Sequence, residues 1–152
     1  MPHLKPILLV EDNLNDLELV LRALKRNNLA NEIVTARHGG EALDFLFRRG
    51  EHAGRMGADP IFILLDLKMP KVDGLEVLKE LKTHETLKLI PVVMLTSSSE
   101  ESDVVKSYRL GVNAYVIKPV DFTQFVEAIR ELGLFWAALN YPPPIAEGSR
   151  QA

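Results

Sequence analysis

Short, wholly apolar runs constrain the fold of this 152-residue chain more than any other feature. Residues 61–65 read Ile-Phe-Ile-Leu-Leu, and comparable runs cover residues 7–10 and 92–95. A continuous apolar run of this length is typical of a strand with both faces buried, as in a parallel sheet. Helix-length stretches with one apolar face separate these runs. The sequence therefore predicts an α/β fold built on a parallel sheet.

Strand runs and helical stretches alternate five times, which is the pattern of repeated βαβ units. The predicted strands cover residues 6–10, 32–36, 61–65, 91–95 and 114–117. The predicted helices cover residues 13–27, 40–47 and 121–139, and two more begin near residues 74 and 98. Right-handed crossovers favour a flavodoxin-like, doubly wound (βα)5 fold with the strand order 2-1-3-4-5. This order places the first and third strands side by side at the switch point.

Helix starts are marked by residues that can cap them. Asn13 and Asp121 are plausible caps of the first and last helices. The spacing of Ser98 and Glu101 predicts a capping box, in which hydroxyl and carboxylate satisfy each other's free backbone donors. The expected apolar face of the first helix consists of Leu14, Leu17, Leu21 and Leu24, with Val20 beside it.

Length and composition indicate one domain over residues 1–139 and a proline-rich tail over residues 140–152. The glycine-rich, charged connection of residues 48–59 is longer than the ~2–6 residues typical of such loops. The net charge of −3 provides no basic surface for nucleic acid. No apolar stretch approaches the ~20 residues that span a bilayer, and no secretory signal is visible. The absence of cysteine excludes disulfides and thiolate chemistry, so we expect a cytoplasmic protein.

Polar side chains follow four of the predicted strands. Glu11 and Asp12 follow the first, Asp66 the third, Thr96 the fourth and Lys118 the fifth. Open α/β sheets bind ligands at these strand ends. Three carboxylates in one crevice repel each other, and oxygen ligands at this density suit Mg²⁺. With an amine and a hydroxyl nearby, the site can accept a phosphoryl group, with the carboxylate of Asp66 as the nucleophile.

This constellation resembles the receiver domain of two-component response regulators over about residues 5–135. Glu11-Asp12 matches the acidic pair of that family, and Asp66, with residues 68–74 after it, matches the phosphoacceptor and its loop. Thr96 matches the switch hydroxyl, Tyr115 the switch aromatic, and Lys118-Pro119 the lysine and its proline.

The resemblance implies a site and a mechanism. Asp12, Asp66 and the backbone carbonyl of Lys68 would bind Mg²⁺ (or Mn²⁺) directly, Glu11 would act through a water, and the bond before Pro119 would be cis. Asp66 would receive phosphate from a histidine kinase in a phosphorelay. Thr96 and Lys118 would then bind the added oxygens, and Tyr115 would turn inward. The protein would be a single-domain response regulator rather than an enzyme, with only Mg-dependent chemistry on itself.

A finer resemblance links the chain to the stand-alone regulators of cyanobacterial and bacterial phytochrome kinases. It is carried by residues 111–122, 132–136 and 140–143 and by the long loop at residues 48–59. It implies a phytochrome partner and a homodimer through the side of the fourth helix, fifth strand and fifth helix. Apolar residues that extend beyond one buried stripe fit such a surface; they are Phe122, Phe135, Trp136 and Leu139.

Other interpretations remain open at this point. The acids at residues 11 and 12 could be a helix cap favoured by the helix dipole, Tyr115 a half-buried strand aromatic, and the aromatics at residues 135 and 136 part of the monomer core. The chain could be an adaptor that never takes phosphate, or a relay intermediate for a different sensor kinase. A phosphatase acting through an aspartyl phosphate commonly has a second acid two residues after the nucleophile, where Lys68 stands. A nucleotide-binding protein would have a glycine-rich loop after its first strand, which this chain lacks.

Overall fold

The computed structural model describes residues 4–27, 29–118 and 122–133. Its core is a five-stranded parallel sheet in the order β2-β1-β3-β4-β5, the order predicted from the sequence. The strands are β1 (Ile7–Val10), β2 (Ile33–Ala36), β3 (Phe62–Leu65), β4 (Val92–Thr96) and β5 (Ala114–Ile117). The α-helices are α1 (Leu14–Arg26), α2 (Gly39–Phe47), α3 (Gly74–Lys82), α4 (Glu101–Arg109) and α5 (Phe122–Gly133).

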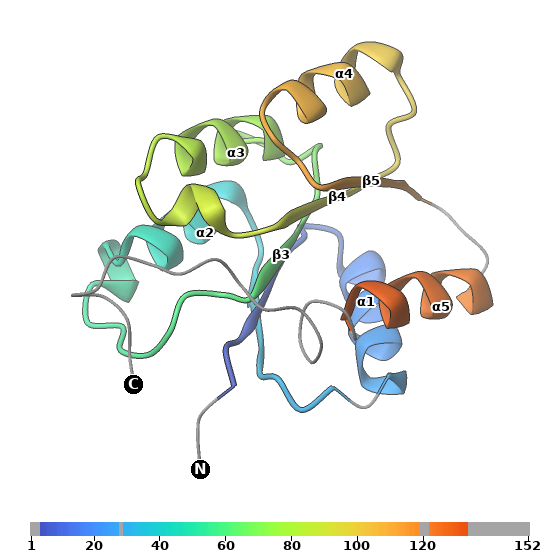
Figure 1. The fold of residues 1–152 in the computed structure, drawn as a ribbon, viewed down its shortest axis with the longest axis horizontal. Helices are drawn as coiled ribbons and strands as arrows, with labels where there is room; N and C mark the ends of the chain where they lie inside the picture. The colour runs from blue at the N-terminus through green and yellow to red at the C-terminus, as the bar shows by residue number, and fades with distance from the viewer. Residues whose placement is uncertain (1–3, 28, 119–121, 134–152) are drawn as a thin grey trace.

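Helices cover both faces of the sheet. Figure 1 shows α1 and α5 together on one side, and α2, α3 and α4 on the other. The side chains of successive strand residues point to opposite faces of the sheet. On β3, Ile63 and Leu65 pack with α2 and α3, whereas Phe62 and Leu64 pack with α1. All four are fully buried. This two-sided burial is the reason that the strand sequences are apolar at every position.

The first helix begins as predicted but buries a different stripe. The side chain of Asn13 caps α1 by accepting the backbone N–H of Asp16 at 3.0 Å. Leu14, which we expected on the apolar face, is 63% exposed. The apolar cluster that α1 packs into includes Leu17, Val20 and Leu24 but not Leu14. The fully buried residues are Val20, Ala23 and Leu24, while Leu17 and Leu21 are partly buried.

The predicted capping box at the start of α4 is wrong. The helix begins at Glu101, three residues later than expected, and its cap residue Glu100 makes no side-chain cap hydrogen bond. The hydroxyl of Ser98 donates instead to the carboxylate of Asp103 at 2.6 Å. The oxygen of the same hydroxyl accepts the backbone N–H of Glu100 at 3.4 Å, one residue before the donor that the capping box requires.

The long connection between α2 and β3 is ordered by its arginines. Arg48 donates to the backbone carbonyls of Arg55 and Gly57, at 2.5 and 2.6 Å. Arg55 in turn donates to the carbonyl of Phe45 at 2.9 Å and to the carboxylate of Asp59 at 3.1 Å. A short 3₁₀ turn, η1 (Gly50–His52), lies within this segment. These side-chain donors add to the backbone hydrogen bonds of the segment, such as those from His52 to Arg49 and from Arg55 to His52.

Some predictions fall on parts of the chain outside the described residues. These are the proline at residue 119, the helix beyond residue 133, the aromatic pair at residues 135 and 136, Leu139 and the proline-rich tail. The side chain of Phe122 is also outside the description, so the predicted dimer surface and the domain boundary at residue 139 stay predictions. In the described part of the chain, every helix is too short or too polar to cross a bilayer.

Gly74 joins the loop after β3 to α3, and we expect its replacement to be costly. A Cβ at this position would collide with the backbone carbonyl of Asp66 and lie 2.8 Å from the Cα of Leu67. Neither atom can move without shifting the strand end. Gly74→Ala should lower the free energy of unfolding, measured by urea denaturation, by about 1–3 kcal/mol.

Gly54→Ala provides the matched control for that measurement. A methyl group at Gly54 would have no atom within 4 Å of it, and the backbone there has no left-handed angle. The free energy of unfolding of this variant should stay the same or rise slightly, since alanine restricts the unfolded chain. Equal losses in the two variants would contradict the packing role assigned to Gly74.

Candidate functional site

Parallel pairing brings three acids together at the carboxyl end of the sheet. Val10 and Leu65 are register partners on β1 and β3, so the residues that follow each strand lie side by side. The backbone N–H of Asp66 donates to the carbonyl of Val10 at 3.0 Å, which continues this pairing past the strand end. As a result, carboxylate oxygens of Glu11, Asp12 and Asp66 lie within 4.8 Å of one another.

Burial makes this cluster electrostatically expensive. Glu11 is 1% and Asp66 6% exposed, whereas Asp12 is half-buried. Burial, followed by the hydrogen bond and the negative charge of Glu11, raises the pKa of Asp66 from 3.8 to about 7, although Lys118 partly opposes the shift. The crevice therefore favours a proton or a cation, and its all-oxygen donor set is one that a hard divalent ion prefers.

Lys118 supplies positive charge directly to the crevice. Its amine donates to Glu11 at 2.7 Å and to Asp16 at 2.8 Å, and its side chain is only 10% exposed. Burial alone would lower the pKa of Lys118, but the hydrogen bonds to Asp16 and Glu11 and the charge of Asp66 outweigh burial and raise it. The amine is therefore charged at neutral pH and points toward the acids.

Thr96 and Tyr115 both contact Ser98, which lies in the loop between β4 and α4. Thr96 is fully buried at the end of β4, and its hydroxyl oxygen accepts the backbone N–H of Ser98 at 3.2 Å. The hydroxyl of Tyr115 donates to the carbonyl of Ser98 at 2.8 Å. The position of this loop is thus coupled to both residues that the family resemblance assigns to switching.

Lys68 connects the loop after β3 to α4. It follows Asp66 by two residues, and its amine lies 3.3 Å from the same Asp103 oxygen that accepts the hydroxyl of Ser98. The hydrogen bonds from Ser98 and then Lys68 hold the pKa of Asp103 below its ordinary value, even though burial opposes them. A chain of polar contacts therefore runs from the crevice mouth to the first turn of α4.

Two acids of this site were missed from the sequence. Asp16 lies in the first turn of α1, and its carboxylate accepts a hydrogen bond from the amine of Lys118 at 2.8 Å. No sequence pattern pointed to this contact, which joins residues 102 positions apart. Asp103 gave no signal either, because its contacts with Ser98 and Lys68 depend on the path of the loop before α4.

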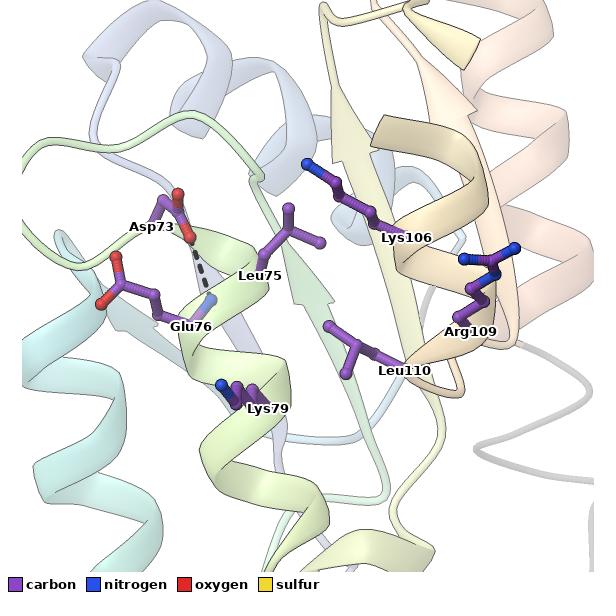
Figure 2. A pocket seen from close by; sticks show the side chains of 7 residues that line it. All are labelled: Asp73, Leu75, Glu76, Lys79, Lys106, Arg109 and Leu110. Carbon is purple, nitrogen blue, oxygen red and sulfur yellow. Dashed lines mark hydrogen bonds between the residues drawn. The ribbon is translucent and has the colours of Figure 1, made fainter. Parts of the chain in front are cut away.

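A groove of about 410 Å³ lies between α3 and α4. Figure 2 shows Leu75 and Leu110 facing each other across it, with Lys79, Lys106 and Arg109 around its edge. None of the three clustered acids lines this groove. The concave surface and the reactive groups are therefore separate features of the described structure.

Comparisons with known proteins identify the family of this chain. A profile of the response regulator receiver domain matches residues 7–130. The response regulator Rcp1 of Synechocystis is 42% identical over 132 residues, which cover 87% of this chain and 88% of Rcp1. The Mn²⁺-bound structure of Rcp1 aligns with a TM-score of 0.81 and 41% identity, and covers 92% of this chain and 99% of that structure.

Two further solved structures are similar over nearly the whole chain. The phosphorylated cyanobacterial phytochrome response regulator RcpA aligns with a TM-score of 0.83 and 42% identity, and covers 94% of this chain and 100% of RcpA. The bacteriophytochrome response regulator RtBRR is 63% identical with a TM-score of 0.77, and covers 93% of this chain and 85% of RtBRR. The family profile and these relatives show that the chain belongs to the response regulator receiver domain family.

Proposed function

We propose that this protein is a phosphoryl-accepting switch in a phosphorelay, with Asp66 as the acceptor. The observation that carries this proposal is the grouping of Asp66 with Glu11 and Asp12, beside the amine of Lys118. An oxygen of the Asp66 carboxylate forms a bond to phosphorus, while the bond between phosphorus and the donor's imidazole nitrogen breaks. The donor histidine leaves as a neutral side chain after it takes up a proton.

The donor set fits Mg²⁺ or Mn²⁺, as the Mn²⁺-bound form of Rcp1 supports by similarity. Asp12, Asp66 and the backbone carbonyl of Lys68 would hold the ion directly, and Glu11 would act through a water. When bound, the ion supplies positive charge that offsets the negative phosphoryl oxygens. The pKa of Asp66, raised by burial and by Glu11, indicates that the acids need such a counter-charge.

The protein's own side chains position the phosphoryl group and transmit its arrival. Lys118 binds one phosphoryl oxygen through its charged amine, and Thr96 binds another through its hydroxyl. Thr96 then gives up the backbone N–H of Ser98, which it accepts at 3.2 Å in the unphosphorylated protein. Since Tyr115 donates to the carbonyl of Ser98, the loop and the aromatic ring respond together. The surface formed by α4 and β5 changes as a consequence.

The kinase that supplies the phosphoryl group is a phytochrome-type histidine kinase in this proposal. Two similar proteins, RcpA and RtBRR, support this choice, because both are phytochrome response regulators by name. The identity of 63% to RtBRR over 93% of this chain favours a bacteriophytochrome.

Labelling with a small phosphodonor tests the acceptor. Incubation with acetyl phosphate and Mg²⁺ should add one phosphoryl group as an acid-stable, base-labile acyl phosphate, seen by intact mass spectrometry. Asp66→Asn should abolish the label. Asp73→Asn is the matched control: it makes the same change in the same loop, keeps a residue able to cap α3, and should label normally. Normal labelling of Asp66→Asn, or sustained turnover of external phosphomonoesters, would contradict the proposal.

Stability against pH tests the electrostatics of the crevice. Between pH 3.8 and about 7 the folded protein keeps a proton on Asp66 that the unfolded chain has lost. Stability of the metal-free protein therefore falls as pH rises through this window. Asp66→Asn removes the buried charge, so it should be more stable than the natural protein by about 1–3 kcal/mol at pH 8, and by nearly nothing below pH 4.

Added Mg²⁺ should reduce that difference in stability. The ion binds the acid cluster of the folded protein and not the unfolded chain, so it should raise the midpoint of thermal unfolding of the natural protein at pH 8. It should raise the midpoint of Asp66→Asn by much less. An equal rise in both proteins would show that the ion binds elsewhere.

Phosphotransfer between purified proteins tests the kinase. A bacteriophytochrome kinase that has phosphorylated itself should transfer its label to this protein at least about tenfold faster than an unrelated histidine kinase does, a difference of about 1.4 kcal/mol in barrier. Asp66→Asn, which lacks the acceptor carboxylate, should take no label from either kinase and is the negative control. Equal rates from both kinases would remove the support for a phytochrome partner and leave the acceptor assignment intact.

A further inference from the structure

We propose that Asp16 is a positioning residue that binds the amine of Lys118 in the unphosphorylated protein and competes for it with the phosphoryl group. The resting contact stands on geometry alone, while the competition rests on the proposed function of Asp66. Asp16 would thereby set how readily the site accepts a phosphoryl group. No metal-binding role for Asp16 is involved, since its carboxylate is outside the cluster formed by Glu11, Asp12 and Asp66.

The contact between Lys118 and Asp16 is as short as the contact between Lys118 and Glu11. The amine lies 2.8 Å from an oxygen of Asp16 and 2.7 Å from an oxygen of Glu11. Both lengths are typical of charge-assisted hydrogen bonds. Because Lys118 is only 10% exposed, water cannot replace either partner easily, and these two carboxylates determine where the amine rests.

The local structure leaves the carboxylate of Asp16 available to Lys118. Asp16 is the third residue of α1, where an acid commonly turns back to accept the backbone N–H of the cap residue. Here the N–H of Asn13 donates to Glu11 instead, at 3.2 Å. The backbone of Asp16 is fixed by its own N–H, which donates to the side chain of Asn13 at 3.0 Å. Glu11 thus replaces Asp16 at the cap, and the side chain of Asp16 reaches across to the residue that follows β5.

The charges around Lys118 predict the direction of the effect. The amine of Lys118 donates to Glu11 and Asp16, and the carboxylate of Glu11 is clustered with those of Asp12 and Asp66. A phosphoryl group brings further negative charge and needs the same amine. The carboxylate of Asp16 opposes the phosphoryl group in two ways: it repels the negative phosphoryl oxygens, and it binds the amine of Lys118. Removing the charge of Asp16 should therefore favour the phosphorylated state. Loss of a residue that binds the phosphoryl group would have the opposite effect and destabilise that state.

Glu18 offers a control for net charge. It lies two residues further along the same helix, is 69% exposed, and pairs with Arg22 at 3.8 Å rather than with Lys118. Glu18→Gln changes the charge of α1 by the same amount as Asp16→Asn. Since exposed charges are screened by water and salt, Glu18→Gln should leave the crevice unaffected.

The first measurement is the affinity for beryllofluoride, a tetrahedral phosphoryl mimic, titrated calorimetrically at saturating Mg²⁺. Asp16→Asn should bind it roughly three- to tenfold more tightly than the natural protein, as expected for one nearby charge at partial exposure. Glu18→Gln should stay within about twofold, and Asp16→Glu, which keeps the carboxylate, should remain close to the natural protein. Equal or weaker binding by Asp16→Asn, or the same gain in Glu18→Gln, would overturn the competition.

The second measurement needs no ligand and tests the resting contact itself. The ¹⁵N-bound protons of the Lys118 amine should exchange slowly with water in the natural protein, because two carboxylates accept them. Their exchange should become faster in Asp16→Asn and remain slow in Glu18→Gln. Unchanged exchange in Asp16→Asn would refute the positioning role. If the natural protein bound no beryllofluoride at all, the proposed function would be contradicted. The exchange rates would still show whether Asp16 binds the amine of Lys118.

Discussion

Parallel pairing of β1 with β3 forces Glu11 and Asp66 into one crevice, and much of the site can be understood as a response to that crowding. Two carboxylates that are almost fully buried, with Asp12 beside them, cannot all remain charged without a counter-charge. Lys118 provides one positive charge, and a divalent ion would provide the rest. The sheet therefore builds a site whose most favourable occupants are cationic, and a dianionic phosphoryl group becomes acceptable only in their company.

The contacts of Ser98 explain how a change at Asp66 can reach the surface. Its backbone N–H, carbonyl and hydroxyl contact Thr96, Tyr115 and Asp103 respectively. A reversal of populations from 1:99 to 99:1 needs about 5.5 kcal/mol. A single hydrogen bond contributes only about 0.5–1.5 kcal/mol net, so no one of these contacts can drive the switch. Several of these hydrogen bonds must change together. Since all three involve Ser98, a movement of that residue can change them at the same time.

The sheet and the central acids were predictable because they depend on backbone pairing and apolar pattern. Runs such as residues 61–65 determine the strands, and the strand order then determines which strand ends are neighbours. The predictions that were wrong concern side chains whose partners depend on rotamers and on the paths of loops. Leu14 has the right helical spacing but is exposed, and Ser98 has the right cap spacing but its hydroxyl contacts Glu100 and Asp103. The contact of Asp16 with Lys118 also needed the observation that Glu11 had taken over the cap.

The contacts of Lys118 join positions that are 107 and 102 residues apart along the chain. During synthesis the acids at residues 11, 12 and 66 leave the ribosome well before residue 118 does, since domains emerge from the amino-terminal end. A nascent or prematurely terminated chain therefore carries the acidic cluster without its amine. Under the proposed function, such a fragment lacks the amine that would bind a phosphoryl oxygen, so the complete site forms only after residue 118 has been synthesised.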